Sequence, residues 1–326
     1  MAAAREYVSK ADLRRLSERS DAMGAWMVAH AWGVIALAIA LFAVWPNVLT
    51  FVLAVVVIGS RQLGLAILMH EAAHGALFRT AALNEWVGRW LCGMPIIADM
   101  GSYRRYHLMH HRFTQTDRDP DLPLSTPFPT TRASLARKFL RDLTGQTGVK
   151  LLFLRIVRAF QLAGDEEAIE EAERASGRKH NLADTNDWSA LAKGLAVNAA
   201  IVVGLGAAGQ AVAEQWWWGL AFWLLPLFTW FQLVLRIRNI AEHAATERSD
   251  DGLRNVRTTL AGPLMRALVA PYWVNYHLEH HVAMYVPCWR LPDLHRLLIA
   301  NGHGERMRVA NSYAAVLRKV GWAQAA

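Results

Sequence analysis

Long apolar runs alternate with charged segments along the chain. Four of these runs, 23–45, 48–69, 191–212 and 218–236, are long enough to cross about 30 Å of hydrocarbon at a rise of about 1.5 Å per residue. The first two are joined by an uncharged turn at Trp45-Pro46-Asn47, and the last two by a short segment at Glu214. The pattern predicts an all-α integral membrane protein with four transmembrane helices.

The remaining segments, 70–187 and 237–326, carry most of the charge and are expected to form a helical cap. Residues 76–100 are apolar on one side and interrupted by polar residues, so they are expected to be interfacial or re-entrant. Residues 132–160 are amphipathic and basic, which is typical of a helix lying on a membrane surface. The charged stretch 165–187 is expected to be a solvent-exposed segment on the cytoplasmic side. Spans and cap together predict a single domain over residues 1–326.

Charge predicts the orientation of the spans. The two short turns carry no Lys or Arg, and the basic segments all lie on the other side, so both termini are expected in the cytoplasm. The formal net charge of +8 fits basic loops facing an anionic membrane surface. No nucleic-acid-binding motif accompanies these basic residues, so no nucleic acid partner is expected.

Histidines are concentrated in four short windows. The chain has 13 histidines, and nine lie in His70–His74, His107–His111, Asn239–His243 and His277–His281. Helical positions i, i+3 and i+4 share a face, so each window aligns its own side chains. The candidate metal ligands are His70, His74, His107, His110, His111, Asn239, His243, His277, His280 and His281. Ten groups are too many for one tetrahedral zinc, so two metal ions are predicted, and imidazole suits Zn, Cu, Fe or Ni.

The order HEAAH, HLMHH and HLEHH at one end of a four-span bundle resembles the membrane fatty acid desaturase and hydroxylase superfamily. The likeness covers roughly residues 40–300, and Asn239 with His243 looks like the extra ligand pair of acyl desaturases. The sequence around Pro287 and Leu291-Pro292 is also similar to that family. The resemblance implies a non-haem di-iron centre with O₂ as co-substrate. Because no cytochrome b5 domain is fused to either end, electrons are expected from a separate ferredoxin, rubredoxin or cytochrome b5-type donor.

Within that family, desaturation of a fatty acyl or lipid-like chain is the preferred interpretation, with hydroxylase, ketolase or decarboxylase activity as alternatives. The substrate is expected to enter between the second and fourth spans and residues 76–100, near Gly64 and Ala66. A more distant alternative is a membrane zinc metalloprotease using His70-Glu71-x-x-His74. That alternative leaves the two H-x-x-H-H boxes without a role.

Other titratable groups are expected to be structural or solvated. His30 lies in an apolar span and is expected to hydrogen-bond within the bundle, whereas surface positions are expected for His180, His295 and His303. Cys92 and Cys288 have neither disulfide nor metal-type spacing and are expected to be buried. For the carboxylates inside the boxes, Glu71, Glu242 and Glu279, support of the metal ligands and ordinary solvated charge both remain open.

Overall fold

The computed structural model describes residues 4–162 and 187–321 and is built almost wholly from helices. Within those ranges the strands are one parallel pair of two residues each, β1 (Thr258–Thr259) and β2 (Val309–Ala310). His180 lies outside the described residues, as does nearly all of the stretch 165–187. The predicted all-α architecture is confirmed.

Four segments are long and apolar enough to cross a membrane, as predicted. They are α3 (Asp21–Val44), α4 (Val48–Ala73), α11 (Asp187–Ala213) and a broken fourth segment. That segment consists of a π-helical turn η4 (Leu220–Leu224), α12 (Leu225–Phe228) and α13 (Trp230–His243). Its continuity was overestimated from the sequence: the backbone breaks at Thr229, with φ −117° and ψ −87°. Pro226 has no backbone N–H to donate, so it weakens the helix just before the break.

Local capping and polar side chains inside the bundle fix the first two spans. Asn47 caps α4 by accepting from the Thr50 backbone N–H, and the Thr50 hydroxyl accepts in turn from the Asn47 N–H. Gln62 is fully buried in α4 and donates to the carbonyl of Trp223 at 3.0 Å. Arg61 likewise turns inward and donates to the carbonyl of Ala267. These polar groups face the bundle, as apolar surroundings require.

Residues 76–100 form short turns rather than a spanning helix. They comprise α5 (Ala81–Val87), the π-helical η1 (Gly88–Gly93) and the 3₁₀ turn η2 (Met94–Ile96), packed against α4 and α11. Trp32 of α3 donates its ring N–H to the carbonyl of Leu91 at 3.0 Å. A Cβ built on Gly88 would lie 2.3 Å from the Ala72 Cβ, so only glycine permits this approach to α4. The segment is thereby held beside the C-terminal half of α4.

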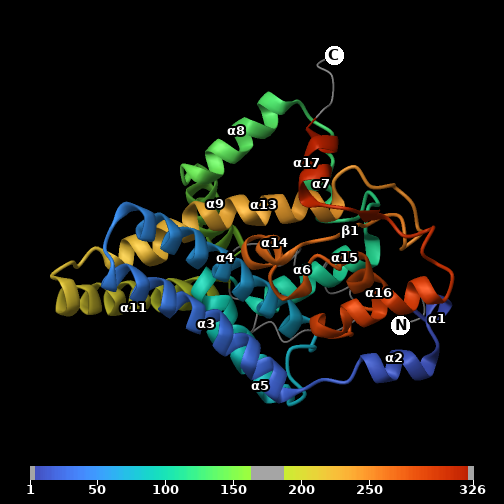
Figure 1. Ribbon diagram of the computed structural model, residues 1–326, viewed down its shortest axis with the longest axis horizontal. Helices are drawn as coiled ribbons and strands as arrows, with labels where there is room; N and C mark the ends of the chain where they lie inside the picture. The colour runs from blue at the N-terminus through green and yellow to red at the C-terminus, as the bar shows by residue number, and fades with distance from the viewer. Residues whose placement is uncertain (1–3, 163–186, 322–326) are drawn as a thin grey trace.

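The other helices of the described residues lie outside the four spans. They are α1 (Ala4–Tyr7), α2 (Lys10–Leu16), α6 (Met100–Phe113), α7 (Leu122–Ser125), α8 (Arg132–Leu143), α9 (Gln146–Leu162), α14 (Pro263–Leu268), η5 (Pro271–Trp273), α15 (His277–Val282), η6 (Cys288–Arg290), α16 (Leu291–Ala300) and α17 (Tyr313–Val320). The first helix packs beside α16, since Asn301 donates to the carbonyl of Tyr7 at 2.9 Å. Both described ends of the chain lie away from the far end of α11 (Figure 1). That the two termini lie on the cytoplasmic side of the membrane stays a prediction.

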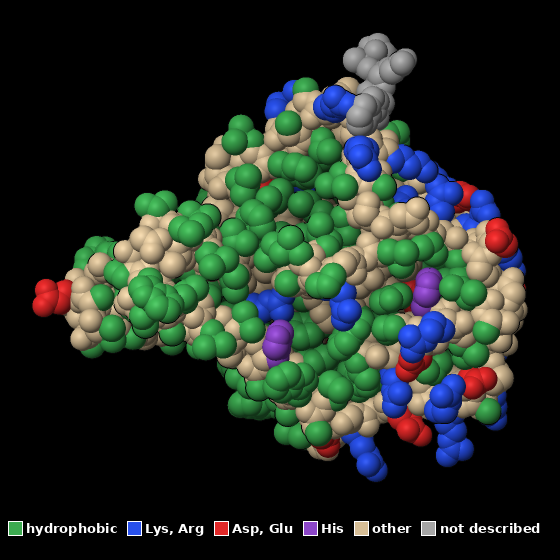
Figure 2. Space-filling view, viewed as in Figure 1, with side chains coloured by type: hydrophobic (Ala, Val, Ile, Leu, Met, Phe, Trp, Pro, Cys, Tyr) green, Lys and Arg blue, Asp and Glu red, His purple; other side chains and the backbone are tan. Residues whose placement is uncertain are grey.

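The surface is divided in the way a membrane protein requires. Hydrophobic side chains dominate the end formed by α11, whereas most charged side chains visible on this face lie toward the other end (Figure 2). Val203 and Val212 of α11 are each 70% exposed, and only 11% of its most apolar window is buried. An apolar helix so little covered by protein needs lipid around it.

Candidate metal centre

Each histidine window sits where its helix points into the cap. His70 and His74 end α4, and His243 is the last residue of α13. The HLMHH box occupies the second half of α6, and the HLEHH box opens α15. Four pieces of sequence separated by up to 207 residues, from His70 to His277, therefore meet at one place.

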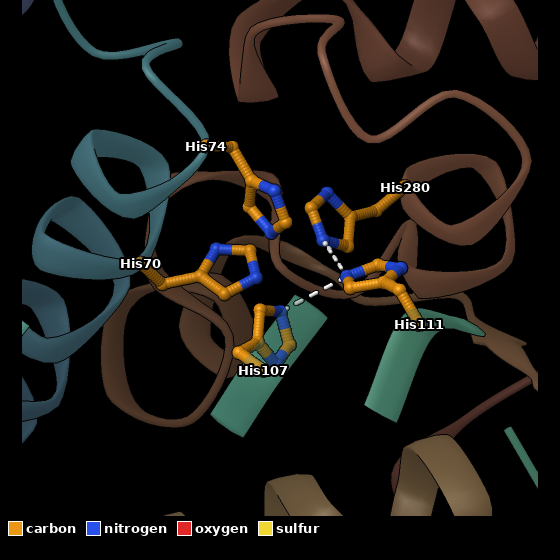
Figure 3. A group of neighbouring side chains, drawn as sticks. All are labelled: His70, His74, His107, His111 and His280. Atoms are coloured by element: carbon orange, nitrogen blue, oxygen red, sulfur yellow. Dashed lines mark hydrogen bonds between the residues drawn. The ribbon is translucent and has the colours of Figure 1, made fainter. Parts of the chain in front are cut away.

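The nine imidazoles divide into two groups. One contains five histidines: His70, His74, His107, His111 and His280. The other contains four: His110, His243, His277 and His281. Within each group one nitrogen from every ring lies within 4.8 Å of the others. Figure 3 shows the five rings of the first group turned toward one another. Both α6 and α15 contribute to both groups.

Ring nitrogens approach one another closely inside the groups. The Nε2 of His111 lies 3.0 Å from that of His107 and 3.1 Å from that of His280. The Nε2 atoms of His243 and His277 are 2.8 Å apart. With metal–nitrogen bonds of about 2.1 Å, neighbouring ligands lie about 3.0 Å apart in an octahedron and about 3.4 Å apart in a tetrahedron. The three spacings are short enough for neighbouring ligands of one metal ion.

The opposite ring nitrogens contact groups that can orient them. The Nδ1 of His110 is 2.8 Å from Asp119 Oδ1, and the Nδ1 of His277 is 3.6 Å from Glu242 Oε2. His281 Nδ1 lies 3.3 Å from the Thr114 hydroxyl. A ligating imidazole commonly donates its second N–H outward, which fixes its tautomer. The role of Asp119 was not predicted; its only sequence signal was its place in the loop after the second box.

The carboxylates inside the boxes are buried rather than solvated. Glu71 Oε1 lies 3.4 Å from His70 Nδ1, and Glu71 Oε2 accepts from the Cys288 backbone N–H at 2.8 Å. Glu242 accepts from Arg238 at 2.6 Å. Of the two readings left open, the geometry favours support of the histidines for Glu71 and Glu242. Glu279 is buried too but faces away from both groups.

Burial keeps these imidazoles in the form that binds metals. Removal from water lowers the pKa of His74 to about 3, from an ordinary value near 6.5. It also holds the pKa well below that range at His107, His111, His277, His280 and His281, and the neighbouring imidazoles add to the effect. Neutral imidazole carries the lone pair that a metal ion needs.

Several buried ring nitrogens find no hydrogen-bond partner among the described residues. They include both ring nitrogens of His74 and the Nε2 atoms of His70, His110 and His281. Buried polar atoms without partners are rare in folded proteins, and a bound ion is one explanation for them. Their convergence within each group is what a bound metal ion would resolve, so the residues fit a two-metal centre.

Asn239 lies one helical turn before His243 on α13 and is partly buried. Its Oδ1 accepts a long hydrogen bond from Arg238, at 3.5 Å. On a helix it shares a face with His243, and its role as a ligand stays a prediction.

The histidines outside the boxes differ from one another. His30 Nδ1 lies 3.1 Å from the Tyr272 hydroxyl, in agreement with a structural role. His303 packs edge-on against Tyr7 and is partly exposed. The expectation of a surface histidine was wrong for His295, whose side chain is only 15% exposed and binds buried Glu279. The long-range contact between α15 and α16 has no signature in the sequence. Cys92 and Cys288 are free and buried, as expected.

An apolar cavity of about 380 Å³ opens beside the five-histidine group. Its walls come from α4, residues 96–98, α9, α12 and α13, and it reaches His70, Tyr103 and Arg238. The Tyr103 ring stacks on His107, with 5.0 Å between ring centres. Ala66 lines the cavity, as predicted. Gly64 does not: a Cβ there would lie 2.9 Å from the Tyr272 ring, because Gly64 points to the opposite side of α4.

Comparison with known proteins agrees with this geometry. Residues 43–309, well over half of the chain, match the family model for fatty acid desaturases. The chain is also similar to dihydrorhizobitoxine desaturase of Bradyrhizobium elkanii, with 27% identity over 290 residues that cover 85% of this chain and 76% of that protein. Family membership indicates a lipid-modifying oxidoreductase held in a membrane. Histidine boxes, apolar spans and family match agree: the chain belongs to the fatty acid desaturase family.

Proposed function

We propose that this protein is an O₂-dependent di-iron oxidoreductase that desaturates a fatty acyl or lipid-like chain. The observation that carries the proposal is the division of nine clustered imidazoles, six of them buried and three partly buried, into groups of five and four that could each hold a metal ion. The first iron would be held by His70, His74, His107, His111 and His280. The second would be held by His110, His243, His277 and His281, with Asn239 as the fifth ligand.

When bound, the iron pair would supply the O₂-dependent oxidation of a C–H bond, with electrons from a separate ferredoxin, rubredoxin or cytochrome b5-type donor. The protein's own part is positioning. Asp119 and Glu242 hold the Nδ1 sides of His110 and His277, which leaves their Nε2 atoms directed inward. Six of the nine histidines are buried, which would limit the access of water and competing reactions of the oxidant.

The substrate is proposed to occupy the apolar cavity between α4, α9 and α13. Its volume of about 380 Å³ and its mainly aliphatic and aromatic lining suit a hydrocarbon segment. Because His70 and Tyr103 line the cavity, a chain that fills it would present a carbon beside the five-histidine group. Positioning of this kind can supply much of a rate enhancement.

Hydroxylation, ketone formation and decarboxylation by the same centre are the alternatives, since they differ only in where the reacting carbon is held. The zinc metalloprotease alternative has less support. The Glu71 carboxylate lies between the Cys288 N–H and His70, so it is not directed at a water between His70 and His74. A protease would also leave the other seven clustered imidazoles without a function.

The decisive test combines metal analysis with product analysis. The purified full-length protein in lipid nanodiscs should contain two irons per chain. With a reconstituted electron donor and O₂, it should convert saturated acyl substrates to products lighter by two mass units. Products heavier by 16 mass units would instead identify a hydroxylase. One zinc per chain with no iron would refute the di-iron assignment.

A further inference from the structure

Glu279 lies inside the third histidine box but does not face the metal centre. On α15 the three histidines at 277, 280 and 281 share one face, and Glu279 lies on the other. Its side chain is fully buried. One carboxylate oxygen is 2.5 Å from His295 Nδ1, and the other accepts from the Thr258 hydroxyl. Both oxygens therefore have a partner, which a buried carboxylate requires.

The two partners belong to elements outside the histidine boxes. His295 lies in the middle of α16, where its ring also packs against Tyr276, the residue before α15. Thr258 lies in β1, and its backbone N–H donates to the carbonyl of Arg308 at 3.0 Å. Its hydroxyl also accepts from the backbone N–H of Leu278 at 3.3 Å. The Thr258 hydroxyl thus contacts both a side chain and the backbone of α15.

The residues on either side of Thr258 hold the end of α13. Arg257 donates to the carbonyls of Ala241 and Ala244 at 3.1 and 2.8 Å. Thr259 donates to the Ala241 carbonyl at 3.3 Å. Ala244 directly follows His243, so the same short segment that anchors α15 also anchors the α13 ligand.

The orientation of α15 affects both metal groups. His280 belongs to the group of five, whereas His277 and His281 belong to the group of four. α15 has only six residues, too few to be stable as an isolated helix. Its orientation must come from tertiary contacts, and the His295–Glu279–Thr258 chain supplies them on the face opposite the metals.

We propose that His295 and Thr258 are positioning residues that act through Glu279 to fix α15, and so set the geometry between the two metal sites. The proposal rests on the di-iron function proposed above. Neither residue belongs to either histidine group, so the effect reaches the three histidines of α15 through Glu279 and, for Thr258, also through the Leu278 N–H.

The test compares matched pairs of full-length variants. His295→Leu and Thr258→Val remove the hydrogen bonds while keeping much of the volume. His295→Asn and Thr258→Ser keep a donor close to its original place. Arg296→Ala is the control on the same helix, since that side chain is 74% exposed. The measurements are iron per chain, the rate of iron loss to a chelator, the Mössbauer spectrum of the iron-loaded protein and the thermal unfolding midpoint.

We expect His295→Leu and Thr258→Val to lose iron about 10–100 times faster than wild type, as for other partners of metal ligands. Their Mössbauer spectra should show altered coupling between the irons, and the Asn and Ser variants should recover most of the loss. If both apolar variants bind two irons, release them at the wild-type rate and keep the wild-type spectrum, the proposal is wrong, even if the unfolding midpoint falls. If His295→Leu does not fold, Thr258→Val alone decides between these outcomes. A wild-type protein without two irons would refute the di-iron function instead.

Discussion

The Nε2 atoms of His243 and His277 lie 2.8 Å apart, although 34 residues separate them in the chain. His243 ends a helix that crosses the apolar part of the protein, and His277 begins a six-residue helix in the cap. Their approach requires α13 and α15 to be placed independently and accurately. Two buried lone pairs at this distance repel unless a cation or a shared proton lies between them, so a metal ion should stabilise the arrangement.

The first prediction concerns the division of ligands between the two metal ions. His74→Ala removes a ligand of the five-histidine group, and His243→Ala removes one of the four-histidine group. Each should lower iron from about two to about one per chain and reduce turnover by at least about 100-fold, because the reaction needs both ions. Iron analysis and turnover on an acyl substrate check this. His303→Ala, outside both groups, should match wild type; full activity of both ligand variants would refute the assignment.

The second prediction concerns Asp119. Asp119→Ala should remove the nearer of the two carboxylates at His110 Nδ1, with Asp121 left at 3.6 Å, and reduce metal affinity or turnover by about 10–100-fold. Asp117→Ala is the matched control. The Asp117 side chain is 94% exposed, and its ion pair with Arg248 is a 3.7 Å contact. Iron retention during dialysis against a chelator measures the effect. Equal retention by the two variants would show that Asp119 does not support the metal.

The third prediction concerns chain length. Ala66→Trp should fill part of the cavity, so the variant should prefer shorter acyl chains while keeping its iron. Gly64→Trp should instead force Tyr272 to move and lower the unfolding midpoint without a specific shift in chain length. Turnover on acyl chains of graded length separates the two. An unchanged preference in Ala66→Trp with iron bound would place the substrate elsewhere.

The fourth prediction concerns the ion pair between α8 and α13. Asp142 is fully buried and contacts Arg236 at 2.5 and 2.8 Å. Asp142→Ala should leave the Arg236 charge without its partner and lower stability by about 3 kcal/mol. Glu247→Ala, which breaks an exposed pair with Arg254, should cost about 1 kcal/mol or less. Thermal unfolding in detergent compares them, and a similar small shift in both would contradict the argument from burial.

The fifth prediction concerns orientation in the membrane. Cysteines introduced at exposed Lys10 and Asn311 should react with an impermeant maleimide only after cells are opened, and one at Pro46 should react in intact cells. The physical reason is the absence of basic residues from the two short turns. The native Cys92 and Cys288 are buried and should stay unlabelled in the folded protein. The reverse pattern would place the histidines outside the cytoplasm.

Much of the architecture follows from the sequence itself. Runs of apolar residues determine four spans because only a helix satisfies its own backbone in lipid. The i, i+3 and i+4 spacing aligns His107, His110 and His111 on one face before any tertiary contact forms. The concentration of histidines at the polar ends of α4 and α13 was also sufficient to predict that they meet.

Other features depend on contacts between segments far apart in the chain, which no local pattern encodes. The grouping of His110 with His243, rather than with its neighbour His111, depends on how α6 crosses α13. The burial of His295 against Glu279 depends on the packing of α16 on α15. Whether Gly64 faces the cavity or Tyr272 depends on how α4 packs against the segment that contains Tyr272. The sequence by itself determined which groups could bind metal and where the membrane spans lie. Only the tertiary structure decided which imidazoles lie together in each group, because the grouping is set by distances of a few ångströms between separately positioned helices.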